Sequence, residues 1–438
     1  MDNDALSLFG RQSAQGKIKG PAGLFFLAAA PFAVFKSFSF SVMASRTKHH
    51  KHHGGLRKKP LVPKWKVFRA KDPVMSVFMW GVNNTITELM HVPPPGLLFP
   101  DEFRAFSKVK VDNHFFNKEN MPSHFKVKHY CPNVFRSLRQ QFGVDQRHYL
   151  RSLTAIEPEL DPQEGSNNFF VSFDRMFVIK VIDSESVAEL HSILFKYHSY
   201  VVERQGKTLL PQYLGLYRIT VDGTDKYFLV MRNIFGSKYA IHKKYDLKGS
   251  TVQRQASEKE KSKELPTFKD NDFLEENHKL TIPPDVKKQL LDILKNDTDF
   301  LTNLHLMDYS LLVGIHDIEK GMEESLAEKE MENEDDSGDE LAPSPPDSPI
   351  PSVSAFNLDE EFFAIVSADS PHQKKFIYFI GLVDILTYYG VKKRTASAAK
   401  SVKYGAEAEH ISTVKPEQYA RRLIEFVDKN VVTTGSDT

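Results

Sequence analysis

The sequence predicts an α+β fold in which antiparallel sheets pack against amphipathic helices. The first observation is the order hairpin, helix, hairpin over residues 169–235. The second is a pair of short apolar strands that lies between two amphipathic helices over residues 284–427. The third is size and composition. A chain of 438 residues, 41% apolar and 26% charged, can bury a sizeable core in one large domain or two modest ones.

The N-terminal residues differ from the rest of the chain. Residues 23–35 (GLFFLAAAPFAVF) form an apolar run after three cationic residues, a pattern that imitates a signal peptide. We favour a disordered N-terminal extension over residues 1–42, because the single cysteine, Cys131, indicates a reducing compartment. Residues 43–64 are interpreted as a solvated basic arm, with a metal site at its two histidine pairs as the alternative.

The first half of the main body contains two helices and two hairpins. Residues 72–89 begin with Asp-Pro, a helix start, and continue with apolar residues at helical spacing. Residues 169–182 are two β-rich runs that flank Asp174–Arg175, which predicts a hairpin. Residues 186–203 repeat apolar side chains with a 3.6-residue period and therefore form a helix. Residues 209–235 are two strands around an Asp-Gly turn.

Ser186 and Glu189 fit a capping box at the start of the helix over residues 186–203. A capping role for Glu189 competes with a second possibility, an ion pair with a strand lysine, Lys180. The spacing leaves both open.

The second half continues with an amphipathic helix over residues 284–306 and a short strand over residues 307–318. Residues 320–357 are acidic and then proline-rich, so we expect a disordered insert. Residues 376–382 (FIYFIGL) form a buried strand, and residues 417–427 a last amphipathic helix. The basic, alanine-rich residues before that helix are ambiguous between loop and helix.

Charge is distributed unevenly along the chain. Residues 319–340 contain eleven acidic and two basic residues, whereas the whole chain has a net charge of +1, so the remainder carries +10. A basic body indicates anionic partners such as phosphates, a membrane surface or nucleic acid. The single cysteine excludes an internal disulfide framework and a cysteine zinc site. The sequence has no apolar stretch long enough to predict a transmembrane helix.

Three charged residues stand at strand ends, where catalytic groups often lie. Lys180 is followed by a helix and an antiparallel hairpin, an order that resembles the small lobe of protein kinases, in which a strand lysine grips nucleotide phosphates. Asp308 and Asp384 border the two later strands, and carboxylates with substrate phosphates are the ligands that Mg²⁺ prefers. The glycine-rich, H-R-D and D-F-G motifs are missing, so an ordinary protein kinase fits poorly.

Longer segments carry a specific resemblance. They cover most of residues 65–432 and resemble the phosphatidylinositol phosphate kinases, in particular the type II branch, the phosphatidylinositol 5-phosphate 4-kinases. The segments are YDLKGS (residues 245–250), MDYSLLVGIHD (307–317), FIGLVDIL (379–386), KVFRA (66–70), FFNKENMPSHF (115–125), ELPTFKDNDF (264–273) and ISTVKPEQY (411–419).

This resemblance implies a protein-kinase-like bilobed fold over residues 65–437, with a small lobe at 65–235 and a large lobe at 236–437. It implies transfer of the γ-phosphoryl group of ATP to the 4-hydroxyl of phosphatidylinositol 5-phosphate, with Mg²⁺ as cofactor. Lys180 is similar to the lysine that binds the nucleotide phosphates, Asp308 to the catalytic acid and Asp384 to the metal ligand.

The resemblance also implies binding residues. Residues 231–235 (MRNIF) resemble the hinge that faces the nucleotide base, so Met231, Arg232, Asn233 and Phe235 are expected to bind nucleotide. Some relatives have Thr where Met231 stands, which leaves GTP use open. The expected substrate-binding residues are Lys248, Arg254, Lys392, Lys393 and Ala396.

The same resemblance, together with the charge pattern, predicts the location of the protein, its binding partners and its phosphorylation sites. We expect a peripheral protein at endomembranes or the plasma membrane, with a nuclear pool left open, and a homodimer or a heterodimer with related kinases. Two basic clusters, residues 238–248 and 392–403, suit an anionic leaflet, and no nucleic-acid motif accompanies them. Ser344 and Ser348 each precede a proline in the acidic insert and are candidate phosphorylation sites.

Two alternatives remain beside the active 4-kinase. One is a membrane scaffold with a kinase fold and low turnover, which restrains other lipid kinases. The other is a 4-phosphate 5-kinase of the type I branch, whose activation loop has Glu where the type II branch has Ala; Ala396 occupies that place here.

Overall fold

The structure is a computed structural model, and it describes residues 68–112, 121–161, 168–236, 238–276, 279–335, 364–368, 374–390 and 414–433. These residues belong to one compact unit, Lys64–Thr438. The predictions for residues 1–42 and 43–64, for Ser344 and Ser348, and for Lys392, Lys393 and Ala396 lie outside the described residues.

A seven-stranded antiparallel sheet forms the first part of this unit. It contains both predicted hairpins, β4–β5 and β6–β7, and these two predictions are confirmed. Its strand order is β1-β2-β6-β7-β5-β4-β3. The strands are β1 (Phe106–Val111), β2 (Phe125–Tyr130), β3 (Glu159–Leu160), β4 (Phe169–Val171), β5 (Phe177–Ile182), β6 (Tyr213–Val221) and β7 (Thr224–Arg232).

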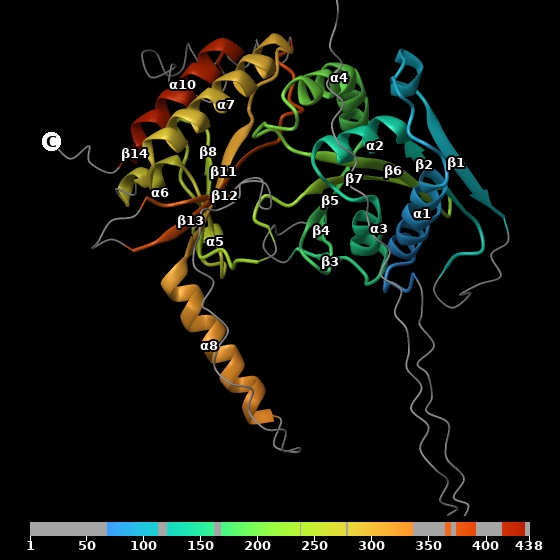
Figure 1. Ribbon diagram of the computed structural model, residues 1–438, viewed down its shortest axis with the longest axis horizontal. Coiled ribbons are helices and arrows are strands. Elements are labelled where there is room, and N and C mark those ends of the chain that lie inside the picture. The colour runs from blue at the N-terminus through green and yellow to red at the C-terminus, as the bar shows by residue number, and fades with distance from the viewer. Residues whose placement is uncertain are drawn as a thin grey trace, which may run out of the picture. The chain divides into compact units, whose positions relative to one another are not determined.

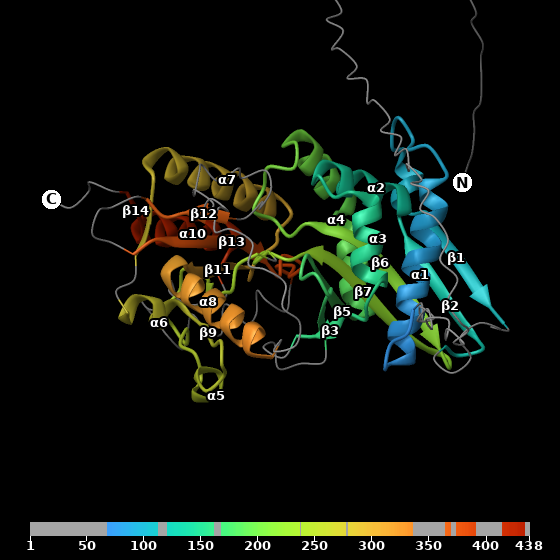
Figure 2. The same ribbon diagram turned by 60° about the horizontal axis from the view of Figure 1, so that its bottom comes forward.

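Four α-helices and a short 3₁₀ helix pack with this sheet. The predicted helix over residues 72–89 is confirmed as α1, whose N-cap residue Asp72 accepts a hydrogen bond from the Val74 amide. Figures 1 and 2 show α1 beside α3. The helices are α1 (Pro73–Met90), η1 (Pro100–Phe103), α2 (Pro132–Gln141), α3 (Gln146–Thr154) and α4 (Ser184–Glu203).

Helix α4 begins two residues earlier than the sequence predicted. Its N-cap is Asp183, whose carboxylate accepts a hydrogen bond from the Ser186 amide at 2.7 Å. Aspartate is as good an N-cap as serine, so either could have started the helix. The predicted capping box of Ser186 and Glu189 is therefore wrong.

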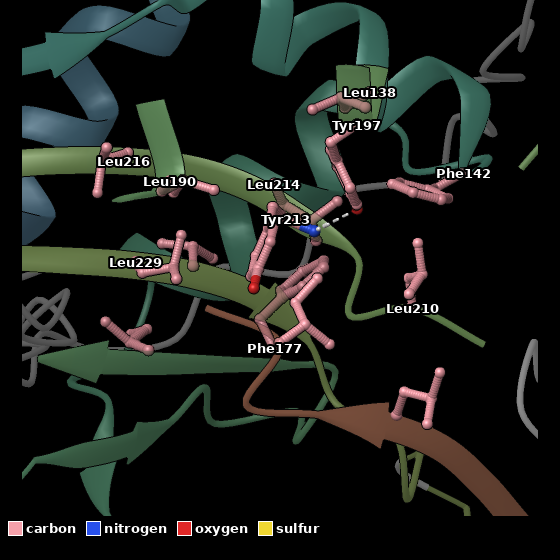
Figure 3. Packing of buried hydrophobic residues seen from close by; sticks show 14 of the residues in the cluster. Leu138, Phe142, Phe177, Leu190, Tyr197, Leu210, Tyr213, Leu214, Leu216 and Leu229 are labelled. Carbon is pink, nitrogen blue, oxygen red and sulfur yellow. Dashed lines mark hydrogen bonds between the residues drawn. The ribbon is translucent and has the colours of Figure 1, made fainter. Parts of the chain in front are cut away.

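The core of the first part lies between α2, α4 and the strands β6 and β7. Figure 3 shows this packing, with the Tyr197 hydroxyl accepting a hydrogen bond from the Tyr213 amide at 3.3 Å. The same hydroxyl donates to the Pro211 carbonyl at 2.6 Å. Fully buried members of this core include Leu138, Leu190, Leu214 and Leu216.

A five-stranded sheet forms the second part. Its order is β12-β13-β11-β8-β9, and the two long predicted strands are confirmed as β11 and β13. The β8–β9 pair is parallel, as is a separate pair, β10–β14; the other pairs among the described residues are antiparallel. The strands are β8 (Lys243–Leu247), β9 (Thr267–Phe268), β10 (Leu280–Ile282), β11 (Ser310–Asp317), β12 (Ala364–Val366), β13 (Phe376–Val383) and β14 (Val431–Thr433).

Two long helices, α7 (Pro284–Asn303) and α10 (Pro416–Asn430), accompany the second sheet, as the apolar periodicity predicted. Figures 1 and 2 show them side by side. Two shorter helices, α5 (Glu258–Lys261) and α6 (Asp270–Glu275), follow β8. Within the described residues, no helix combines the length and apolarity that a bilayer span needs.

Helix α8 (Ile318–Asp335) corrects part of the expected disorder at residues 320–357. The Asp317 carboxylate accepts hydrogen bonds from the Glu319 and Lys320 amides at 3.1 and 3.2 Å and so caps the helix. The segment is rich in Glu, which favours helix even where little apolar surface is buried. Figure 1 shows α8 extending away from the five-stranded sheet. Residues 336–357 lie outside the described part.

A buried carboxylate joins the helices of the two sheets. Asp297 of α7 is fully buried and accepts hydrogen bonds from the Tyr200 hydroxyl, the Thr208 hydroxyl and the Leu209 amide at 2.6, 2.7 and 2.6 Å. Burial raises the pKa of Asp297 to about 6, although these donors oppose the shift. The Leu382 amide of β13 also donates to the Leu209 carbonyl at 2.7 Å.

Candidate active site

Three strands of the second sheet end at one edge and bring charged residues together there. In the β11–β13 pairing Ser310 lies opposite Val383, and in the β11–β8 pairing Leu311 lies opposite Leu247. Asp308 comes two residues before the start of β11, whereas Asp384 and Lys248 directly follow β13 and β8. The antiparallel register therefore places two acids and a lysine at the same edge, as strand pairing requires.

Lys180 of β5 reaches this edge from the first sheet. Its Nζ donates to Asp384 Oδ1 at 2.7 Å and lies 5.1 Å from the centre of the Phe169 ring. The alternative ion pair with Glu189 is not formed; Glu189 is exposed on α4. Burial raises the pKa of Glu189, and the nearby acids Asp183 and Glu185 add to the shift.

A second contact at this edge joins Lys248 and Asp308. Lys248 Nζ donates to the backbone carbonyl of Asp308 at 2.7 Å and to its Oδ1 at 3.0 Å. The side chains are 17% and 27% exposed, so the pair is accessible from solvent but partly shielded from it. Such shielding strengthens electrostatic interactions relative to those at an open surface.

Both acids have an unusual backbone conformation. The φ angle is +68° at Asp308 and +58° at Asp384, in the left-handed region that residues other than glycine rarely occupy. Aspartate tolerates this region better than most residues, because its short polar side chain hydrogen-bonds locally. Strained residues of this kind concentrate at functional sites, where the surrounding structure holds them in place.

Arg254 lies behind Lys248 in a buried ionic cluster. Its Nε donates to Asp270 Oδ2 at 2.7 Å, and its Nη2 donates to the carbonyl and carboxylate of Asp246. Asp270 also accepts hydrogen bonds from the Lys248 and Ser250 amides at 2.9 and 3.2 Å. The cluster thus fixes the backbone of the loop that carries Lys248.

The pKa shifts in this cluster have opposing causes. Burial alone would lower the pKa of Arg254, but Asp270 and Asp246 more than offset it, and the net shift is upward. Burial raises the pKa of Asp270, against the effect of Arg254. The Arg254 side chain is only 11% exposed and is already paired with Asp246 and Asp270. A lipid phosphate would therefore have to compete with these two carboxylates for Arg254.

The four hinge candidates lie where the chain leaves β7. Met231 pairs with both Val178 and Tyr213, so it is held between two strands. The Arg232 amide donates to the Gln212 carbonyl at 3.2 Å.

Asn233 and Phe235 continue this segment. The Asn233 amide donates to the Met176 carbonyl at 2.9 Å, and its Oδ1 accepts a hydrogen bond from the Phe235 amide at 3.1 Å. The Phe235 ring then packs on Gly314 of β11, where a Cβ atom would lie only 2.6 Å from the ring. The segment from Met231 to Phe235 thus connects the two sheets and is fixed to both.

Sequence reasoning identified Lys180, Asp308, Asp384 and Lys248, and the structure brings these four together. It missed the supporting acids Asp246 and Asp270. Both fall within segments that carry the family resemblance, but no spacing signal marks them as buried.

Asp384 suits a magnesium ion. Its carboxylate is 61% exposed, which leaves room for an ion and for phosphate oxygens. Among the residues that the structure describes, no group of three or more His, Cys, Asp or Glu side chains forms a metal cage. Mg²⁺ is usually held by one or two carboxylates together with substrate phosphates, so the residues present fit it.

Comparison with known proteins adds a family assignment. Residues 154–430 match the family described as phosphatidylinositol-4-phosphate 5-kinase. The chain is 50% identical over 406 residues to phosphatidylinositol 5-phosphate 4-kinase type-2 alpha of Gallus gallus, which covers 90% of this chain and 98% of that protein. The type-2 alpha and type-2 beta proteins of Homo sapiens are 49% and 51% identical over 400 and 388 residues. These alignments cover 88% and 84% of this chain and 97% and 92% of the relatives.

Proposed function

The chain belongs to the phosphatidylinositol phosphate kinase family, and from this membership we propose that it phosphorylates the 4-hydroxyl of phosphatidylinositol 5-phosphate with ATP. The product is phosphatidylinositol 4,5-bisphosphate. One observation supports this assignment most directly: Lys180, Asp384, Asp308 and Lys248 meet at one edge through two charged contacts. These residue types suit phosphoryl transfer, which depends on positioning and charge stabilisation.

In the proposed reaction the inositol 4-hydroxyl oxygen attacks the γ-phosphorus of ATP. The bond from that phosphorus to the β–γ bridging oxygen breaks, and ADP leaves. The Asp308 carboxylate accepts the hydroxyl proton, while Lys248 holds Asp308 in place. Lys180 would bind the phosphates of ATP. Asp384 would hold Mg²⁺, which would supply positive charge beside the transferred group.

The residues Met231, Arg232, Asn233 and Phe235 are proposed to hold the nucleotide base. Their backbone is fixed to both sheets, which provides a rigid wall for a planar ring. Met231 offers no hydrogen-bonding side chain to a base, so the choice between ATP and GTP rests with the other groups. Measuring turnover with each nucleotide at equal concentration decides it.

A basic surface supports action at an anionic membrane. On the β1–β2 hairpin Lys108 lies opposite Lys128, and Lys110 lies opposite Lys126. Like charges placed directly opposite one another destabilise a sheet, so an anionic partner would relieve this repulsion. We propose a cytoplasmic enzyme, peripheral at endomembranes or the plasma membrane, that works as a homodimer or pairs with related kinases. The hydroxyl substrate is part of a lipid, and each basic group near an anionic leaflet contributes about 1 kcal/mol of binding.

A lipid kinase assay tests the proposal. Purified protein is supplied with labelled ATP, Mg²⁺ and vesicles that contain either phosphatidylinositol 5-phosphate or phosphatidylinositol 4-phosphate. Preferential labelling of the 5-phosphate supports the 4-kinase. Preference for the 4-phosphate would establish the 5-kinase alternative. Absence of turnover on both, with vesicle binding retained, would establish the low-activity scaffold.

A further inference from the structure

Helix α10 contacts the loop that carries Asp308. Tyr419 of α10 is fully buried, and its hydroxyl donates a hydrogen bond to the backbone carbonyl of Tyr309, the residue after Asp308. The rings of Tyr419 and Tyr309 meet edge to face with their centres 4.8 Å apart. The hydroxyl and the ring therefore hold the same neighbour of Asp308 in two ways.

The same helix contacts the loop that carries Lys248. The Arg422 guanidinium lies 5.2 Å from the Tyr419 ring and donates to the Lys248 carbonyl at 3.5 Å. Gly249 has a φ of +66°, and a Cβ atom there would lie 2.8 Å from the Arg422 carbonyl oxygen and 2.9 Å from Leu423 Cα. Only glycine allows the backbone of α10 to approach this loop so closely.

Helix α10 thus contacts both loops next to Lys248 and Asp308, the two residues that are hydrogen-bonded to each other. Asp308 has a strained left-handed backbone, and Lys248 donates both to its carbonyl and to its carboxylate. A shift of either loop relative to the other would therefore change the Lys248–Asp308 geometry. Positional errors of about 1 Å at a catalytic group cost large factors in rate.

We propose that Tyr419 is a positioning residue of the reaction: through α10 it holds the Lys248 and Asp308 loops in register with each other. The proposal rests on the assignment of Lys248 and Asp308 to catalysis above. The proposed positioning role distinguishes α10 from a helix that only covers the core. A covering helix would affect stability alone, whereas a positioning helix affects turnover through Lys248.

The test is Tyr419→Phe, which keeps the ring and removes only the hydroxyl. We expect kcat to fall roughly tenfold, the amount that corresponds to one hydrogen bond, with KM for ATP unchanged because Lys180 and the hinge are not moved. The matched control is Tyr197→Phe, which removes another buried hydroxyl bonded to a backbone carbonyl. It should lower the melting temperature at least as much as Tyr419→Phe does, because the Tyr197 hydroxyl also accepts a hydrogen bond from the Tyr213 amide, and it should leave kcat at the wild-type value.

A second comparison identifies the route of the effect. In a Lys248→Met background, adding Tyr419→Phe should change the remaining kcat by less than twofold, since the contact through which Tyr419 acts is already lost. The inference is overturned if Tyr419→Phe keeps wild-type kcat, or if its loss is as large in the Lys248→Met background as alone. Loss of turnover in Lys248→Met with no effect of Tyr419→Phe would leave the proposed function standing and remove only the role of α10.

Discussion

Lys180 Nζ lies 2.7 Å from Asp384 Oδ1, so one charged hydrogen bond joins β5 of the seven-stranded sheet to the residue after β13 of the five-stranded sheet. Both residues are proposed to bind groups of the same substrate, the phosphates and their Mg²⁺. ATP would therefore insert its phosphates at a contact that already links the two sheets. Under this proposal, nucleotide binding would be coupled to the relative placement of the two sheets.

The first prediction concerns the three charged residues proposed to act in the reaction. Lys180→Met, Asp308→Asn and Asp384→Asn should each lower kcat by at least about a hundredfold, because each removes charge stabilisation from the transition state. Both Asp→Asn changes keep a residue that tolerates the left-handed backbone, so circular dichroism and the melting temperature should stay close to wild type. Near-normal turnover by any of the three variants would remove that residue from the mechanism.

The second prediction concerns pH and Asp297. Its native pKa of about 6 lies above the usual value of 3.8, so the native state binds the proton more tightly than the unfolded state. The stabilisation is fully present below pH 4 and is lost as pH rises through about 6. Between low and neutral pH the free energy of unfolding falls by about 3 kcal/mol from this group, since one pKa unit corresponds to about 1.4 kcal/mol. Melting temperatures of wild type and Asp297→Asn between pH 4.5 and 7.5 measure the effect. Wild type should lose stability relative to the variant as pH rises, and parallel profiles would contradict this.

The third prediction concerns the lysines of the β1–β2 hairpin. Replacing Lys108 and Lys126 by Gln should weaken binding to anionic vesicles by about 2 kcal/mol, or roughly 30-fold. The matched control replaces Lys196 and Lys288, which are exposed on α4 and α7, by the same residue. Vesicle sedimentation at low and physiological salt should also show steep weakening, because surface charges are screened over about 8 Å at 0.15 M. Salt-insensitive binding would point instead to inserted apolar side chains.

The fourth prediction concerns the acidic insert. Deleting residues 321–352 removes most of α8, including Glu324, which accepts a hydrogen bond from His242 Nε2 at 3.0 Å. The apolar residues Met322 and Leu326 are exposed, so their removal costs no core. We expect unchanged kcat and KM and a loss of stability below about 1 kcal/mol, as for a surface ion pair. A large fall in kcat or in stability would show that the insert has a structural role.

The fifth prediction concerns substrate choice and Ala396, which lies outside the described residues. If the uncharged Ala396 leaves Lys392 and Lys393 free of a local acid, Ala396→Glu should shift preference from the 5-phosphate toward the 4-phosphate lipid. Both isomers are assayed in the same bilayers. A mutant with the wild-type ratio of rates would exclude Ala396 from specificity.

Long periodic segments were predictable from sequence, because the spacing of apolar residues within a single helix or strand indicates that element without knowledge of its neighbours in the fold. The helices α1, α4, α7 and α10 and the hairpins β4–β5 and β6–β7 are examples. Hairpin β1–β2 was not predicted, although its strands alternate lysines with more buried residues, which is the period-2 pattern of a half-buried strand.

The candidate site was predictable in its residues but only partly in its contacts. Lys180 had a plausible partner nine positions away, yet it pairs with Asp384, 204 positions away, because folding brings the sheet edges together. Asp297 likewise takes its three donors from residues 88 to 97 positions away. Pairings of this kind depend on tertiary structure and cannot be predicted from residues nearby in the sequence.

The left-handed backbones of Asp308 and Asp384 have an evolutionary consequence. Asparagine is among the few residues that such a conformation accepts, and its codons differ from those of aspartate in a single base. If Asp308 and Asp384 act as proposed, a descendant of this gene could lose phosphoryl transfer in one mutational step and keep its fold. Loss of catalysis and loss of the folded protein would then be separable events, and non-catalytic copies could arise without passing through an unfolded intermediate.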